Sequence, residues 1–236
     1  MREDNLILSD WVILQQEEKF RFGTDAVLLY GIVPRPCGKT ADLCSGSGAV
    51  ALMLIAGGKT EQVTAVEIQP ECCRLARESA EKNGASARLT TLCADICKIS
   101  DFLQEGTFDT VTVNPPYFKK GSGLLPPDES VAISRHELLC TIDDVFSAAA
   151  YLLKEKGKFY MVHRTDRQKE ILAKIQKFGL FPTEIYRVFS KPSKESKLFL
   201  VAATKGRAER ECKYIDFTVA NEDGSLTKAY KSIQEE

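Results

Sequence analysis

Apolar and polar residues alternate along this chain in a pattern that predicts short buried strands separated by amphipathic helices. Short runs rich in Val, Ile, Leu and Phe predict seven strands, at 40–44, 62–66, 88–93, 108–113, 157–162, 183–190 and 197–204. Helical spacing of apolar residues predicts helices at 25–32, 48–57, 70–83, 141–154 and 167–178. Such alternation is typical of an α/β fold with a mostly parallel sheet covered on both faces. A short turn between the last two strands predicts an antiparallel C-terminal hairpin in this seven-stranded sheet.

The predicted elements form one block, which is expected to be a single domain over residues 1–236. Within it we expect an N-terminal extension at 1–37, a catalytic core at 38–205 and a C-terminal tail at 206–236. The tail is polar and weakly patterned, and a strand at 213–219 is the one element expected in it.

A glycine turn between the first of these strands and its helix has the composition of a nucleoside-binding loop. Gly46, Gly48 and Ala51 match the spacing G-x-G-x-x-A, in which the glycines permit a tight turn and a close backbone approach to a ligand. Free amides at the helix start favour an anionic group. Glu67 ends the next strand, 21 residues past Gly46, where an acidic residue can hydrogen-bond ribose hydroxyls. The unit leaves two ligands open, a dinucleotide or S-adenosylmethionine.

The tetrapeptide Asn114-Pro115-Pro116-Tyr117 follows a predicted strand, at the edge where open α/β sheets place their ligands. The amide of Asn114 has one acceptor and two donors, so it can hold an amino group. Pro115 and Pro116 fix the backbone and remove two donors, which leaves carbonyl groups free to accept. Tyr117 offers a flat face on which a planar base or amide can stack. The loop is therefore expected to cradle a planar NH2 group that is to be alkylated, which favours S-adenosylmethionine as the ligand.

Together the two motifs resemble those of the class I S-adenosylmethionine-dependent methyltransferases with an amino-group acceptor. The first motif of that family, an acidic residue followed by Gly-x-Gly-x-Gly, appears here from Asp42 to Gly48, with Cys44 where the first Gly is usual. Cys44 fits if the backbone there does not need a positive φ. The resemblance implies a Rossmann-like class I fold and S-adenosyl-L-methionine as cofactor. The cofactor contacts that it implies are Asp25, Asp42, Cys44, Gly46, Gly48, Glu67, Ile68, Asp95, Ile96 and Asn114.

Further segments resemble a narrower family, the bacterial tRNA1(Val) adenine-37 N6-methyltransferases. They are Gly-Thr-Asp-x-x-Leu-Leu at 23–29, Arg135-His136-Glu137, and Pro-x-Lys-Glu-x-Lys at 192–197. This resemblance spans residues 5 to about 205. It implies that the segment around Asp25 closes over the cofactor, and that the substrate is an anticodon-loop adenine of valine tRNA.

For such a substrate the expected catalytic residues are Asn114, Pro115, Pro116 and Tyr117. Hydrogen bonds from the adenine NH2 to the carbonyl groups of Asn114 and Pro115 would aim the nitrogen lone pair at the methyl group, so positioning and electrostatics would supply most of the catalysis. The base must leave its stack, so base flipping is expected. The substrate contacts that we expect are Tyr117 and Phe118 as stacking platform, with Lys119, Lys120, Arg135, His136, Lys191, Lys194 and Lys197.

The net charge of −1 hides an uneven distribution. Between Lys154 and Lys213, 16 Lys and Arg stand against 7 Asp and Glu, and the rest of the chain carries a net −10. A basic region on an otherwise acidic protein is typical of a phosphate-binding face. A solvated surface is the alternative interpretation for any single lysine. As a whole the bias favours tRNA as partner.

The composition argues against several other kinds of site. The eight cysteines contain no C-x-x-C pair and the chain has two histidines, so no metal site is expected and the thiols should be reduced. No apolar run approaches the ~18 residues of a membrane helix. The N-terminal sequence does not resemble a signal peptide. We therefore expect a cytoplasmic protein with no membrane partner, and the oligomeric state stays open.

Two other interpretations also stay open. Asn-Pro-Pro-Tyr loops serve enzymes that methylate glutamine side chains in release factors or adenine in DNA, and both targets are planar amino groups. The short N-terminal extension argues against the first class, and the lack of room for a target-recognition insert argues against the second. The second interpretation is a non-catalytic RNA-binding module on a methyltransferase fold. The set Asp42, Gly46, Gly48, Glu67 and Asn114 argues against it.

Overall fold

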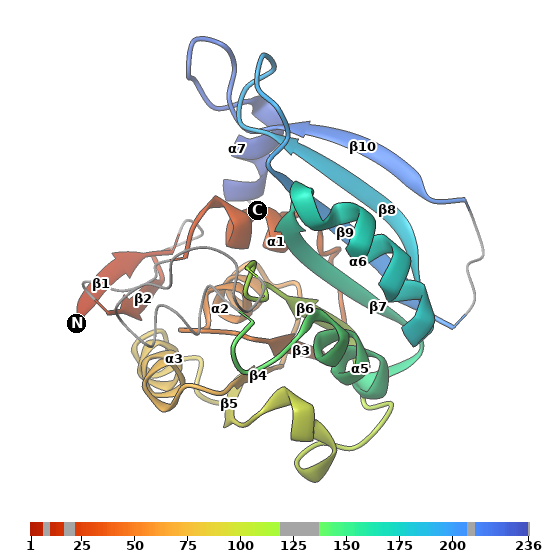
Figure 1. Ribbon diagram of the computed structural model, residues 1–236. Helices are drawn as coiled ribbons and strands as arrows, with labels where there is room; N and C mark the ends of the chain where they lie inside the picture. Colours follow the sequence, from red (N-terminus) through yellow and green to blue (C-terminus); the bar gives the residue numbers. More distant parts are fainter. Residues whose placement is uncertain (7–9, 17–21, 119–136, 207–210, 236) are drawn as a thin grey trace.

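The computed structural model describes residues 1–6, 10–16, 22–118, 137–206 and 211–235 (Figure 1). Its main sheet is formed by β3 Thr40–Leu43, β4 Val63–Glu67, β5 Leu89–Cys93, β6 Phe108–Val113, β7 Leu153–Arg164, β8 Leu180–Phe189, β9 Leu198–Lys205 and β10 Lys213–Thr218. The strand order is β10-β8-β9-β7-β6-β3-β4-β5. The strands from β7 to β5 pair in parallel, and β9 runs antiparallel to both β7 and β8. The mostly parallel sheet and the antiparallel hairpin are thus confirmed.

The described sheet has eight strands rather than the predicted seven, because β10 pairs in parallel with the outer edge of β8. The strand expected at 213–219 therefore joins the main sheet. The predicted strand at 157–162 is also too short. Strand β7 begins at Leu153, directly after the preceding helix, and continues to Arg164.

Helices cover both faces of the sheet. One face is packed by α1 Thr24–Ile32, α2 Ala49–Ala56 and α7 Lys228–Gln234, and the other by α5 Ile142–Leu152 and α6 Gln168–Ile175. The remaining helices are α3 Pro70–Lys82, next to β5, and the 3-10 turns η1 Ile96–Asp101, η2 Thr165–Arg167 and η3 Gln176–Phe178. Alternating residues of β7 enter the two cores: Phe159 and Met161 face one, and Tyr160 and Val162 the other. This period of two is the reason that one strand can serve both layers. No helix in the described part of the chain is long and apolar enough to cross a membrane.

An N-terminal hairpin, formed by β1 Arg2–Asn5 and β2 Val12–Gln15, was not predicted by the sequence pattern. Long-range hydrogen bonds hold it against α3. The amide of Leu14 donates to Ser79 Oγ at 2.9 Å, and the side chain of Asn83 bonds both backbone groups of Val12. The strands of this hairpin are short and partly polar, so the apolar pattern of the sequence does not predict them. The hairpin is stabilised by these contacts to α3 and its C-terminal end.

The C-terminal segment also docks on the body of the protein. Tyr230 and Ile233 of α7 are buried, and α7 contacts α1. At Gly31 the helices approach so closely that a Cβ atom would lie 2.5 Å from Ile233 Cδ1. The tail expected to be loose is therefore a packed element from Lys228 to Gln234.

Candidate active site

Two buried carboxylates brace the turn that follows β3. Asp42 Oδ1 accepts a hydrogen bond from Thr112 Oγ1 at 2.7 Å, and its Oδ2 accepts one from Ser45 Oγ at 2.6 Å. Glu67, at the end of β4, accepts the backbone amide of Gly46 at 2.9 Å. Burial raises the pKa of Asp42 to about 6 and also raises the pKa of Glu67, although hydrogen bonds oppose the shift in both.

Cys44 lies in this turn with a φ of +54°. The condition under which a cysteine fits easily here, a backbone without a positive φ, is therefore not met. Left-handed backbone favours glycine, because a Cβ atom crowds the following carbonyl oxygen. The turn carries this strain at Cys44, the position at which the resembled motif usually has glycine.

The turn opens onto a cavity that is lined by residues at the carboxyl ends of β3, β4, β5 and β6. Figure 1 shows these four strands side by side in the sheet. Most of the predicted cofactor residues line this cavity: Asp42, Cys44, Gly46, Glu67, Ile68, Asp95, Ile96 and Asn114. Gly48 does not; it precedes α2 with a φ of +84°, and a Cβ atom there would lie 3.2 Å from Ala76 Cβ. The motifs in the sequence do not identify the other lining residues, notably Gln15, Phe22, Ala26, Leu75, Leu139 and Cys140.

Asp25 was predicted to contact the cofactor, and the structure places its carboxylate elsewhere. The neighbouring Phe22 and Ala26 line the cavity, but Asp25 is not among the lining residues. Its Oδ2 atom accepts hydrogen bonds from Asn114 Nδ2 at 3.2 Å and from the Tyr117 hydroxyl at 2.6 Å. The segment therefore approaches the cavity, whereas the acid itself contacts the acceptor loop.

The acceptor loop follows β6 and reaches the same cavity through Asn114 and Pro116, while Pro115 is buried. Asn114 Oδ1 lies 2.7 Å from the hydroxyl of Tyr117. The loop thus places one side-chain carbonyl at the wall of the cavity and anchors it on both sides.

The ring of Tyr117, predicted to stack on the substrate base, is packed against the protein itself. Its ring packs beside the buried ring of His163, with 5.1 Å between ring centres, and it does not line the cavity. Burial and the charge of Asp25 raise the pKa of the Tyr117 hydroxyl well above its usual value, so the hydroxyl keeps its proton. Phe118, the second predicted platform residue, lies under the guanidinium of Arg164, 4.9 Å from the ring centre.

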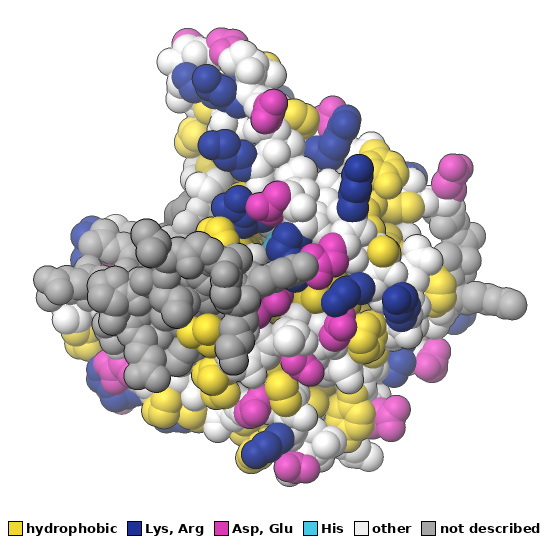
Figure 2. All heavy atoms as spheres, viewed as in Figure 1, with side chains coloured by type: hydrophobic (Ala, Val, Ile, Leu, Met, Phe, Trp, Pro, Cys, Tyr) yellow, Lys and Arg dark blue, Asp and Glu magenta, His cyan; other side chains and the backbone are white. Residues whose placement is uncertain are grey.

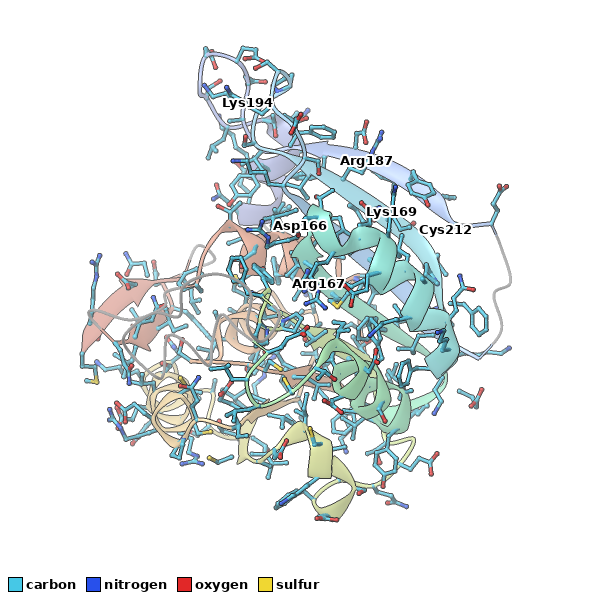
Figure 3. The ribbon with its side chains drawn as sticks, viewed as in Figure 1. Asp166, Arg167, Lys169, Arg187, Lys194 and Cys212 are labelled. Carbon is cyan, nitrogen blue, oxygen red and sulfur yellow. The ribbon has the colours of Figure 1, made fainter. Side chains whose placement is uncertain are left out.

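A buried arginine joins the two ends of the segment that follows the loop. Arg167 forms an ion pair with Glu137 and a second with Glu170, and it donates to the carbonyl of Tyr117 at 3.5 Å. The amide of Glu137 also donates to the carbonyl of Phe118 at 2.7 Å. Figure 3 shows Arg167 between α6 and the centre of the molecule. Lys119, Lys120, Arg135 and His136 lie outside the described residues.

The predicted phosphate contacts lie on the projecting turn between β8 and β9. Lys194 and Lys197 are exposed, and Figure 3 shows Lys194 on this projection. The Nζ atom of Lys191 donates a hydrogen bond to the carbonyl of Glu222 at 3.1 Å, so its ammonium group is held against the protein. Figure 2 shows Lys and Arg side chains spread from the projection across this face, with acidic side chains between them. In the described part of the chain, no three His, Cys, Asp or Glu residues are grouped as metal ligands.

Comparisons with known proteins agree with this geometry. The model of the methyltransferase small domain matches residues 17–179. A tRNA1(Val) (adenine(37)-N6)-methyltransferase of Porphyromonas gingivalis is 30% identical over 190 residues, covering 76% of this chain and 72% of the relative. One of the same name from Histophilus somni is 25% identical, covering 95% and 92%. Among solved structures, a protein described as a predicted O-methyltransferase from Agrobacterium tumefaciens superposes with a TM-score of 0.69 at 23% identity, over 89% of this chain and 95% of its own. This last likeness concerns the fold alone.

Proposed function

The chain belongs to the methyltransferase small domain family, and from this premise we propose that it transfers a methyl group from S-adenosyl-L-methionine to N6 of an adenine in tRNA. One observation carries the proposal. The braced glycine turn and the Asn-Pro-Pro-Tyr loop open onto the same cavity, so a donor held by the first lies next to an acceptor held by the second. The names of the relatives support tRNA as the substrate class.

The lining of the cavity fits this cofactor. Carboxylates of Asp42, Glu67 and Asp95 stand among apolar side chains, which suits a ligand with a cationic sulfonium, ribose hydroxyls and a flat adenine. When bound, S-adenosyl-L-methionine supplies an electrophilic methyl group. Glu67 is suited to accept from ribose hydroxyls, since it lines the cavity and its carboxylate oxygens already accept backbone amides there. Ile96 and Leu75 offer apolar surface to the adenine ring.

The acceptor loop supplies the positioning. Asn114 Oδ1 and the carbonyl of Pro115 can accept the two N–H groups of the adenine amino group, which leaves the nitrogen lone pair to face the donor. The amino group is a weak nucleophile, so a preorganised pair of acceptors lowers the barrier by positioning and electrostatics, and after transfer the cationic nitrogen loses its proton to solvent. The adenine has to leave its stack to reach the loop. The exposed Lys194 and Lys197 are suited to the backbone phosphates of the RNA, and the adenine of the valine tRNA anticodon loop is the favoured target.

Substitution of Asn114 by alanine tests this proposal. We expect transfer to isolated tRNA to fall by ~100-fold or more, as for loss of one preorganised transition-state contact. Affinity for S-adenosylhomocysteine should change by less than about fivefold, because the cofactor contacts of the glycine turn are kept. N6-methyladenosine is measured by mass spectrometry of nucleosides, with Asn5→Ala on the exposed β1 strand as control.

Near-normal transfer by the Asn114→Ala enzyme would remove the role given to the loop. Methylation by the wild-type protein of a glutamine peptide or of DNA, in place of tRNA, would overturn the substrate class. A wild-type enzyme that methylates tRNA other than valine tRNA would correct the favoured target alone.

A further inference from the structure

Asp25 connects the first turn of α1 to the acceptor loop. Its Oδ1 atom accepts the backbone amide of Ala26 at 2.9 Å, and its Oδ2 atom faces both Asn114 and Tyr117. Gly23 makes room for this arrangement, since a Cβ atom there would lie 3.1 Å from Asp25 Oδ1. The carboxylate is half-buried and lies outside the cavity lining, so a role other than cofactor binding is needed to explain its contacts.

The first consequence concerns the orientation of the Asn114 amide. An ionised carboxylate accepts hydrogen bonds and donates none, so it stabilises the amide with Nδ2 directed at Asp25. The reversed amide would place two oxygen atoms 3.2 Å apart without a proton between them. Asp25 thereby fixes Oδ1 as the group that is left to face an amino donor.

The second consequence concerns the proton of Tyr117. The hydroxyl lies 2.6 Å from Asp25 Oδ2 and 2.7 Å from Asn114 Oδ1, but it has one proton to give. The proton therefore lies in a hydrogen bond shared by both oxygens, and the charged carboxylate takes the stronger part of it because it is the better acceptor. Without Asp25, the same proton would turn to Asn114 Oδ1 and compete there with the amino group of the substrate.

We propose that Asp25 is a positioning residue for methyl transfer, which orients the Asn114 amide and draws the Tyr117 proton away from the oxygen that must accept from the substrate amino group. The proposal rests on the function proposed above. It assigns the Gly23-Thr24-Asp25 segment to the acceptor side of the site, although the same segment borders the cofactor cavity.

Substitutions at Asp25 test the proposal through turnover and cofactor affinity together. Asp25→Ala should lower kcat for tRNA methylation by ~10- to 100-fold, because the acceptor is misoriented and partly blocked. Affinity for S-adenosylhomocysteine should stay within about threefold. Asp25→Asn keeps a hydrogen-bond acceptor without the charge, so its kcat should lie between those of the wild-type and Asp25→Ala enzymes. Asp143→Ala, in the first turn of α5 and outside the cavity lining, controls for loss of a half-exposed acid at a helix start.

Two double variants separate positioning from simple support of the fold. Asp25→Ala should cost nothing further in an Asn114→Ala background, because it acts through Asn114. Removal of the competing hydroxyl by Tyr117→Phe should restore part of the activity of Asp25→Ala, although each change removes a native group. The proposal would be overturned if the losses of Asp25→Ala and Asn114→Ala multiply in the double variant, or if Tyr117→Phe restores no activity to Asp25→Ala. It would also be overturned if the cofactor affinity of Asp25→Ala falls by the same factor as its turnover.

A readout without substrate keeps this test distinct from that of the proposed function. The side-chain amide signals of Asn114 can be identified in a nitrogen-15 spectrum by their absence from the Asn114→Ala protein. They should shift in Asp25→Ala and shift less in Asp25→Asn. Unchanged signals would overturn the positioning role even if the wild-type protein methylates tRNA, and a wild-type protein inactive on tRNA would overturn the proposed function alone.

Discussion

His163 is buried next to the acceptor loop, and this burial determines its protonation state. It is fully buried between the rings of Tyr117 and Phe199, and its Nδ1 atom accepts the amide of Arg164 at 2.8 Å. Burial, with a smaller effect of the Arg167 charge, lowers the pKa of His163 to about 4. The ring that supports Tyr117 is therefore neutral at neutral pH, with its proton on Nε2.

This lowered pKa predicts a loss of stability in mild acid. An unfolded histidine takes up a proton near pH 6.5, whereas folded His163 does so only near pH 4, so the unfolded state binds more protons in between. Above pH 6.5 the titration of His163 takes nothing from the free energy of unfolding. Between pH 7 and pH 5 this free energy should fall by about 2 kcal/mol, because only the unfolded state takes up the proton. Urea denaturation of wild type and His163→Asn at both values measures it, because the difference between the proteins cancels other titrating groups. Equal pH dependence of the two would contradict the assignment.

At the scale of elements, the turn before α6 holds the acceptor loop in place. Arg167 is 8% exposed, and it contacts both Glu137 and the carbonyl of Tyr117, which lie at the two ends of the segment after the loop. An arginine before a helix with many polar residues reads in the sequence as a solvated charge. The sequence therefore could not identify Arg167, since its two partners beside the loop are 30 and 50 positions away.

Substitution of Arg167 should affect both the fold and catalysis. Arg167→Met removes the one ion-pair partner that Glu137 has among the described residues, and breaking a buried ion pair typically costs about 3–5 kcal/mol. We expect a clear drop in thermal stability and a fall in turnover of roughly tenfold, with cofactor affinity unchanged. Arg187→Met is the matched control, because its pair with Asp216 is about half exposed and should contribute ~0–1 kcal/mol. A similar small effect from both variants would show that Arg167 does not support the loop.

At the scale of the whole molecule, the basic face is less uniform than its charge suggests. Several of its cations already form ion pairs, as Lys154 does with Asp109 and Arg187 with Asp216. Lys194 and Lys197 form no ion pair within the described residues and are exposed on the projection between β8 and β9. They are the cations of this turn that are best placed to meet RNA phosphates.

Charge reversal of this pair should weaken RNA binding and reduce its salt dependence. If Lys194 and Lys197 each contact one phosphate, the double change to Glu should lower the slope of log affinity against log salt by roughly 1.4. Filter binding at several salt concentrations measures the slope. The control is Arg77→Glu with Lys82→Glu on α3, next to the β5 edge at the other end of the sheet. The same slope for both double variants would make the projection an ordinary solvated surface.

Much of the fold could be predicted because buried strands leave short runs rich in apolar and β-branched residues, as at 63–67 and 108–113. The glycine turn and Glu67 were accessible for the same reason, since one strand–helix–strand unit contains both. The β1–β2 hairpin, the bonds of Asp25 and the docking of α7 could not be predicted. Each depends on contacts between distant residues whose local composition is ordinary.

The docking of α7 has a consequence for the order in which the protein acquires its function. The hydroxyl of Tyr230 contacts Thr24, directly before Asp25, and Ile233 fills the space left by Gly31. During translation, α1 leaves the ribosome about two hundred residues before α7. A growing chain can thus complete the cofactor turn early, while the helix that carries Asp25 still lacks its support. We expect ribosome-bound chains that stop before Lys228 to bind S-adenosylhomocysteine and yet to methylate tRNA poorly. The ability to transfer a methyl group would then form only at the end of synthesis.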